Sequence, residues 1–308
     1  MAVDRLTELC DLVEVHNLVT GGVVARGGWR SHGPITDPIK FFALIDGRAK
    51  LRTDGVAAPI EMTAGDVAIL VSRSWIEFEA GEAPRVEVDP ESDFTSPPFT
   101  TRGPADDVIL GGCISFNEAG SALLEGSFPP VAVIRASEVD THGLRDTLRR
   151  LLDEATAALP GAEFAIRQYA QLLLLGLLRA YAGQTDVPAG ILRLHADDRL
   201  RPALDLMHEH PARNWGLDEL SRAAAMSRTS FAERFRELSG MPPLTYLTRW
   251  RMLVAQRTLR ERDARIAELA EMLGYGSESA FSTAFKRVVG ESPLRYRARR
   301  RDAPARSA

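Results

Sequence analysis

The C-terminal third of the chain repeats itself at a fixed offset of 50 residues. The stretch MLGYGSESAFSTAF at 272–285 resembles the stretch LSRAAAMSRTSFAERF at 220–235. Six pairs of identical residues share the offset: Phe231 and Phe281, Phe235 and Phe285, Gly240 and Gly290, Pro243 and Pro293, Leu244 and Leu294, and Tyr246 and Tyr296. So many matches at one offset indicate a duplicated unit, and this part of the chain must fold as two copies of one motif.

Each copy predicts two helices joined by a tight turn. Ser227 and Ser277 stand where N-caps are needed, because a serine hydroxyl accepts hydrogen bonds from backbone N–H groups of the first turn. Gly240 and Gly290 end the second helices, and proline follows each of them. This is the helix-turn-helix pattern. We expect the first helices and the turns at Leu217–Ala224 with Met226-Ser227, and at Arg265–Leu273 with Gly274-Tyr275-Gly276.

The second helix of each copy predicts a surface suited to DNA. The phenylalanine pair, four residues apart, faces the core. Short side chains on the opposite face let a helix approach the major groove, while hydroxyls, carboxylates and cations meet base edges and phosphates. A solvated amphipathic helix often has a similar face, but two copies in register favour DNA binding. The opposite faces carry Thr229, Ala232, Glu233 and Arg236 in the first copy, and Ser279, Ser282, Thr283 and Lys286 in the second.

Charge is distributed unevenly along the chain. Residues 1–190 hold 16 Lys and Arg against 27 Asp and Glu, whereas residues 191–308 hold 22 against 15. The formal net charge of −4 therefore divides into −11 and +7. A basic C-terminal third favours a polyanionic partner, and the acidic remainder excludes a chain that coats nucleic acid along its whole length.

Size and composition are those of a globular protein with two domains. The chain has 308 residues, of which 45% are hydrophobic and 26% charged. No apolar run reaches 18 residues, and the start MAVDRLTELCDL carries acids where a signal peptide needs a basic segment. We therefore expect a cytoplasmic protein with no membrane partner. Two cysteines, Cys10 and Cys113, are too few for a disulfide framework or a cysteine zinc site.

The first 130 residues predict β structure. Short apolar runs such as KFFALI and DVAILV alternate with turn signals about every ten residues, and Asp46-Gly47 and Asp54-Gly55 are hairpin pairs. This spacing indicates a sandwich or a barrel. The segment 183–199 carries Gly, Pro and Asp, which interrupt regular structure. We expect domains at 1–185 and 200–302 with a linker at 186–199.

Two helices are expected between the β region and the linker, at Thr141–Leu159 and Ala162–Tyr181. Leucines at 144, 148, 151 and 152 fall on one stripe, and the second helix is apolar around more than half its surface. Such a helix needs cover from several sides. The run Leu172–Leu178 either packs inside its own domain or forms the interface of a homodimer.

The last hundred residues resemble the DNA-binding domain of the AraC/XylS family of bacterial transcriptional regulators. The resemblance covers Arg201–Arg301 and rests on LMHEHPARNWGLDELSRAAAMSRTSFAERFRELSGMPPLTYLTRWRM and IAELAEMLGYGSESAFSTAFKRVVGESPLRYR. It implies seven helices, a long connecting helix at about Pro243–Glu261, and two recognition helices in neighbouring major grooves. Arg236 and Lys286 are then expected at phosphates. The positions that the resemblance places against bases are Arg228, Thr229, Glu233, Glu278, Ser279, Ser282 and Thr283.

The N-terminal part resembles the cupin-like sensor domain of one branch of that family. The resemblance rests on WRSHG at 29–33, AGDVAIL at 64–70 and GGCISF with LLEGSFPPVAVIRAS before the two helices. Metal-binding cupins carry a cluster of histidines and a carboxylate, but the first 140 residues hold only His16 and His32, and Trp75 stands where a second histidine is expected. We expect no metal and no cofactor. A small-molecule effector is expected near Trp29, His32 and Trp75, with His32 a hydrogen-bonded residue rather than a metal ligand.

Cys113 and Cys10 have two interpretations. Relatives in this branch sense oxidants through cysteine, so the pair is a candidate redox site. Cys113 also fits a small buried hydrophobic residue on a strand, with no basic neighbour in sequence to lower its pKa.

The sequence as a whole predicts an α+β chain of two domains: a cupin-like β-barrel followed by two helices, then an all-α domain with two helix-turn-helix motifs. Two function classes compete, a regulator that responds to an effector and a cupin enzyme that has acquired a DNA-binding domain. An enzyme needs paired carboxylates, a metal cluster or an activated nucleophile, and the barrel segment shows none of these patterns. We therefore expect a non-enzymatic regulator of transcription, an activator that binds double-stranded DNA as a homodimer and contacts RNA polymerase, although the residues themselves do not distinguish activation from repression.

Overall fold

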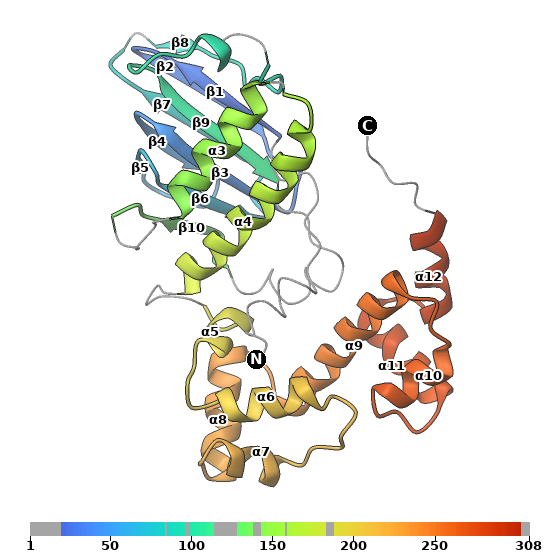
Figure 1. The fold of residues 1–308 in the computed structure, drawn as a ribbon. Helices are drawn as coiled ribbons and strands as arrows, with labels where there is room; N and C mark the ends of the chain where they lie inside the picture. Colours follow the sequence, from blue (N-terminus) through green and yellow to red (C-terminus); the bar gives the residue numbers. More distant parts are fainter. Residues whose placement is uncertain are drawn as a thin grey trace. The chain divides into compact units, whose positions relative to one another are not determined.

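The computed structural model describes residues 20–83, 85–95, 99–113, 128–137, 143–157, 159–182 and 188–302 (Figure 1). The chain divides into two compact units. Their described parts are residues 20–182 and residues 188–302, apart from the gaps above. Cys10 and His16 lie outside the described residues. No helix in the described part of the chain is long and apolar enough to cross a membrane.

The described part of the N-terminal unit contains two five-stranded sheets, so the cupin-like β-barrel that we expected is not closed by strand pairing. All described strand pairs are antiparallel except β2 with β8. The first sheet has the order β1 (Gly21–Ala25), β9 (Asp107–Cys113), β3 (Ile39–Asp46), β6 (Val67–Val71) and β10 (Val131–Ile134). The second has the order β5 (Ile60–Thr63), β4 (Arg48–Thr53), β7 (Trp75–Ala80), β2 (Trp29–Pro34) and β8 (Val86–Glu87).

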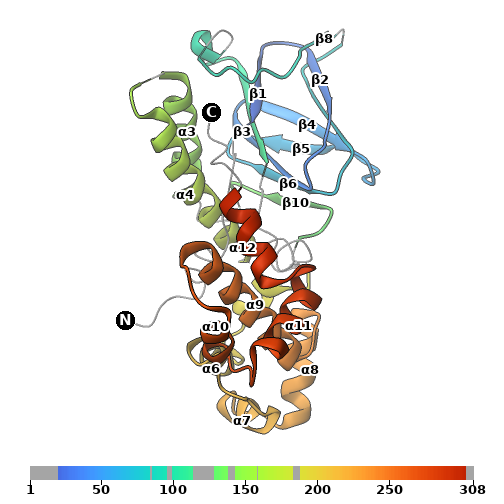
Figure 2. The ribbon, with the colours of Figure 1, turned by 90° about the vertical axis from the view of Figure 1, so that its right-hand side faces the viewer.

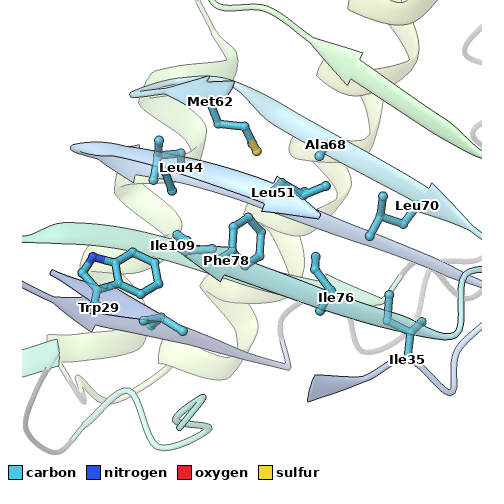
Figure 3. Packing of buried hydrophobic residues seen from close by; sticks show 12 residues of the cluster. Trp29, Ile35, Leu44, Leu51, Met62, Ala68, Leu70, Ile76, Phe78 and Ile109 are labelled. Carbon is cyan, nitrogen blue, oxygen red and sulfur yellow. The ribbon is translucent and has the colours of Figure 1, made fainter. Parts of the chain in front are cut away.

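Apolar side chains from both sheets form the core of this unit (Figure 3). Strand β4 shows why, because its residues alternate between exposed Arg48, Lys50 and Arg52 and buried Ala49 and Leu51. Strand β9 is instead buried along most of its length, as a central strand covered on both faces must be. The core thus combines half-buried and fully buried strands.

Two helices, α3 (Leu144–Ala157) and α4 (Ala162–Ala182), pack against each other, α3 against β3 and α4 against β10. Figure 2 shows them beside the sheet that holds β1 and β3, with β4 and β5 farther away. The expected helices are therefore present. Most of the leucine run is core, because Leu173, Leu174, Leu177 and Leu178 are buried, whereas Leu172 keeps 53% of its surface exposed.

The C-terminal unit is helical, and seven helices span the region that resembles the AraC/XylS domain. They are α6 (Arg201–Glu209), α7 (Leu217–Ala223), α8 (Arg228–Ser239), α9 (Pro243–Glu261), α10 (Ile266–Met272), α11 (Glu278–Val289) and α12 (Pro293–Asp302). The connecting helix α9 has the bounds that we expected. In Figure 1 it runs from the α6–α8 group to the α10–α12 group.

Part of the expected linker is ordered structure. Residues Ile191–His195 form a further helix, α5, which packs on α8. Ile191, Leu192 and Leu194 are buried, and the Gly190 N–H donates to the Leu238 carbonyl over 2.8 Å. The apolar residues of this segment are covered by tertiary contacts, which the breakers around them in the sequence do not reveal.

Asp66 joins the turn between β5 and β6 to the end of β10. It is buried and accepts from the N–H groups of Thr63 and Ala136, both at 2.9 Å, and from Arg135 Nη1 at 3.0 Å. Burial alone would raise its pKa, but these three donors outweigh burial and hold the pKa below the ordinary 3.8.

We predict that Asp66→Asn lowers the free energy of unfolding by about 1–3 kcal/mol at neutral pH, because an amide N–H would face a buried donor. The pKa of Asp66 is lower in the folded protein than the ordinary 3.8. The carboxylate therefore stabilises the fold fully above pH 3.8, and this stabilisation disappears as the pH falls through the pKa of the folded protein. Denaturant titrations should show a constant difference in the free energy of unfolding between the variant and the unsubstituted protein from about pH 7 to pH 5. This difference should become smaller at lower pH. Asp153→Asn, which alters a carboxylate that is 70% exposed and paired with Arg102, is the control, and equal losses for both variants would contradict the prediction.

Candidate nucleic-acid interface

The first recognition helix, α8, is held by its cap and its aromatic core. The Ser227 hydroxyl accepts from the Ser230 N–H at 3.2 Å, and Gly240 ends the helix at φ +75°. Phe231 and Phe235 are fully buried. The opposite face is therefore turned outward, and the predicted residues Arg228, Thr229, Glu233 and Arg236 are all exposed.

The second recognition helix, α11, repeats this construction. Ser277 accepts from the Ala280 N–H at 3.1 Å, Gly290 ends the helix at φ +92°, and Phe281 and Phe285 are fully buried. Its outward face is also the predicted one. Glu278, Ser279, Thr283 and Lys286 are exposed, and Ser282 is half-buried.

A polar cluster that sequence reasoning missed supports the back of the first copy. The Tyr246 hydroxyl lies 3.0 Å from His195 Nε2 and 2.8 Å from His208 Nε2. The His208 ring stacks on Trp250 with ring centroids 3.6 Å apart. Because these residues come from α5, α6 and α9, the cluster joins three helices behind α8. The 50-residue repeat marked Tyr246 but not the histidines, which have no counterpart in the second copy.

Asp197 connects the segment before α6 to the recognition helix. Its carboxylate accepts from the Leu200 N–H at 2.9 Å and from Arg234 Nε at 3.1 Å, and Arg234 Nη2 forms a further bond. Burial opposes ionisation of this carboxylate, but the hydrogen bonds from Arg234 and from the Leu200 N–H, together with the charge of Arg234, lower its pKa. Arg234 therefore holds α8 in place, unlike its exposed neighbours Glu233 and Arg236.

The three residues expected at an effector site do not lie together. Trp29 is buried in the core between the sheets, and its Nε1 donates to Asp107 Oδ2 at 2.7 Å (Figure 3). His32 is exposed and Trp75 half-exposed, with ring centroids 6.0 Å apart. Trp29 and His32 are three residues apart on β2, so they point to opposite faces of the sheet. Only His32 and Trp75 share a surface.

Cys113 is a buried cysteine at the end of β9 and forms no disulfide with a described residue. It lies opposite Lys40 on β3, and Lys40 Nζ is 3.4 Å from Asp37. Its burial agrees with the interpretation as a small core residue. Within the described residues, no three His, Cys, Asp or Glu side chains are placed to hold a metal ion.

Comparisons with known proteins match both units. A cupin family model matches residues 4–183, and a helix-turn-helix domain model matches residues 220–299. An AraC-like transcription regulator of Streptomyces lividans is 33% identical over 297 residues, which cover 96% of this chain and 98% of that protein. The RCS-specific HTH-type transcriptional activator RclR of Escherichia coli K12 is 34% identical over 301 residues, with coverage of 96% and 98%.

Among solved structures, the DNA-binding domain of AdpA in complex with a target DNA is 35% identical. It covers 36% of this chain and 100% of that domain, with a TM-score of 0.34. The similarity to the two regulators extends over nearly the whole chain, and each unit matches its own family model. The chain therefore belongs to the AraC family of DNA-binding transcriptional regulators, with a cupin-like N-terminal domain.

Proposed function

We propose that this regulator recognises a DNA sequence with both recognition helices at once, α8 in one segment of the site and α11 in the next. The observation that carries the proposal is the matched exposure of equivalent faces on the two helices. The connecting helix α9 has 19 residues, so at about 1.5 Å per residue it spans roughly 28 Å. That length approaches the roughly 34 Å between successive turns of one groove.

The proposed contacts divide by chemistry. Hydroxyl groups and carboxylates discriminate between bases, and Glu233 in particular suits the amino group of a cytosine because it only accepts hydrogen bonds. Arg236 and Lys286 lie later on their helices and bind phosphates, which carry no sequence information. The base-contacting set is Arg228, Thr229, Glu233, Glu278, Ser279, Ser282 and Thr283.

A small effector bound by the cupin-like unit is proposed to control this activity. The support is the position of α5, which follows that unit in sequence and is bonded to α8 through Gly190 and Leu238. A displacement of Gly190 would therefore act on α8 directly through this bond. His32 and Trp75 share one exposed surface, which makes them the better-placed pair for the effector. Activation of transcription is proposed by analogy with the Escherichia coli protein, whose name calls it an activator, and contact with RNA polymerase is proposed as its means.

A homodimer is proposed through the outer face of α4. Phe164 is 63% exposed and Leu172 is 53% exposed, and their spacing of eight residues places them on one side of the helix. Burying two such side chains in each protomer would contribute about 1.5–3 kcal/mol per side chain. The rest of the leucine run is already covered within the protomer.

We predict that Thr283→Ala weakens base discrimination in one segment of the site and Glu233→Ala in the other, by about 1–3 kcal/mol per lost base contact. Arg236→Ala and Lys286→Ala should weaken binding to all sequences about equally. Duplexes selected from a random library by the full chain, followed by competition binding, provide the measurement. A further duplex with about 5 base pairs inserted places the segments on opposite faces of the DNA. Unchanged binding to that duplex would show that one copy alone contacts DNA.

We predict that Leu172→Glu converts the protein into monomers, since a charge would have to be buried at the interface. Light scattering at micromolar concentration measures the mass. Val86→Glu, at a residue that is 68% exposed on β8, is the matched control and should leave the mass unchanged. A monomeric unsubstituted protein would rule out the proposed dimer.

A further inference from the structure

The two helix-turn-helix copies meet at a seam where one side chain of α9 touches both. Arg251 is half-buried, and its Nε donates to the Pro211 carbonyl at 2.6 Å while Nη2 donates to the Arg213 carbonyl at 2.9 Å. Both acceptors lie in the loop between α6 and α7. One planar guanidinium thus fixes two points of the first copy's backbone, which a single-point cation cannot do.

That loop is itself held rigidly to the first copy. Trp215 is buried and its Nε1 donates to the His210 carbonyl at 3.1 Å, and the Arg213 guanidinium lies 4.1 Å from the Trp215 ring centroid. Arg213 also pairs with Glu219 at 2.6 Å, and Glu219 accepts from the Gly216 N–H at the start of α7. A displacement of the loop therefore displaces α7.

On its other side Arg251 faces the second copy. Its Cζ atom lies 5.7 Å from the ring centroid of Tyr275, in the turn between α10 and α11. Tyr275 in turn packs edge-on against Phe281 of the recognition helix, with centroids 5.5 Å apart. Burial lowers the pKa of Arg251 and raises that of Tyr275, although the attraction between the two opposes both shifts. The contact is thus partly removed from water, where a cation over an aromatic ring is stronger.

Gly274 brings the two backbones into direct contact. It has φ +76°, and a Cβ atom placed on it would lie 1.9 Å from the Ala212 carbonyl oxygen. Only glycine allows this approach without moving one of the two segments. The turn of the second copy is therefore fitted against the same loop that Arg251 binds.

We propose that Arg251 is a positioning residue that sets the spacing and the rotational phase between α8 and α11, and hence the number of base pairs between the two segments of the DNA site. This inference rests on the proposed recognition of DNA by both helices. Helix α9 fixes the distance between the copies, while the contacts of Arg251 and Gly274 fix the angle at which the second copy stands. One inserted base pair shifts a segment by about 3.4 Å and rotates it by about 35°.

The test uses the full chain and a duplex selected from a random library by the unsubstituted protein. Footprinting identifies the two segments of this duplex that the protein protects. Variants of the duplex then carry one base pair more or one base pair fewer between these segments. The unsubstituted protein should lose about 10-fold or more in affinity with each change, as expected when base contacts of one helix are lost. Arg251→Met keeps the apolar stem but removes the donors. This variant should bind the original duplex about 10-fold more weakly than the unsubstituted protein does. Adding or removing one base pair between the segments should lower its affinity by less than about 3-fold.

Arg257→Met is the matched control, because Arg257 also lies on α9 but donates to Glu261 of the same helix. It should keep the sharp spacing preference. If circular dichroism shows that Arg251→Met is unfolded, Arg251→Lys and Gly274→Ala are tested instead, because they alter the same contacts. Each of them should broaden the spacing preference.

A folded Arg251→Met protein with the sharp preference of the unsubstituted protein would overturn the inference. Absence of any spacing preference in the unsubstituted protein is a different result, and it would overturn the proposed recognition by two helices.

Discussion

The orientation of each recognition helix depends on two buried phenylalanines one helical turn apart. Phe231 and Phe235 in α8, like Phe281 and Phe285 in α11, are fully buried. The second ring of each pair packs against Tyr246 or Tyr296, at centroid distances of 5.5 Å and 5.7 Å. Rotating either helix would expose rings whose burial is worth about 1.5–3 kcal/mol each and would bury charged groups in their place. The polar faces therefore point outward in only one way.

The two copies share this aromatic core but differ in what surrounds it. In the first copy the Tyr246 hydroxyl meets two histidines from α5 and α6, whereas in the second the Tyr296 hydroxyl accepts from Arg260 Nη1 at 3.3 Å. The first copy is thus the one bonded to the segment that follows the cupin-like unit. On the proposed mechanism a signal reaches α8 first, and the Arg251 seam carries its consequence to α11.

Features that depend on neighbouring residues were predictable from the sequence. Caps, stop glycines and the spacing of the phenylalanines are local, and they placed α7, α8, α10 and α11 within a residue of their bounds, while the family resemblance placed α9. The strand pairing that forms two sheets depends on residues far apart in the sequence, and so does the packing of α5 against α8. Neither could be predicted from neighbouring residues. Arg251 binds backbone carbonyls some 40 residues earlier, and carbonyls leave no pattern in a sequence. One signal in the sequence does point to it, because a further arginine, Arg301, stands at the same 50-residue offset.

The separation of Trp29 from His32 illustrates a different error. The motif WRSHG suggested one site, but residues three apart on a strand point to opposite faces of the sheet. Trp29 therefore lies in the core, where its Nε1 donates to Asp107. A pattern of residue types on a strand indicates a shared site only if the residues are an even number of positions apart, because only then do their side chains point to the same face. The same check on α8 and α11, with a helical period, kept the predicted residues on one face.

Net positive charge also overstates how much of the basic unit is available to DNA. Several of its arginines hold the unit together, since Arg213, Arg234, Arg297 and Arg299 pair with carboxylates and Arg251 binds carbonyls. Their charge still attracts a polyanion at a distance, but their donors are directed at the protein. Contacts on the recognition faces are left to small polar groups with a few cations such as Arg236 and Lys286. On the proposed mechanism few phosphate contacts are made there, so the geometry of the two helices contributes to the choice of sequence, and the residues that fix that geometry matter for specificity together with those that touch the bases.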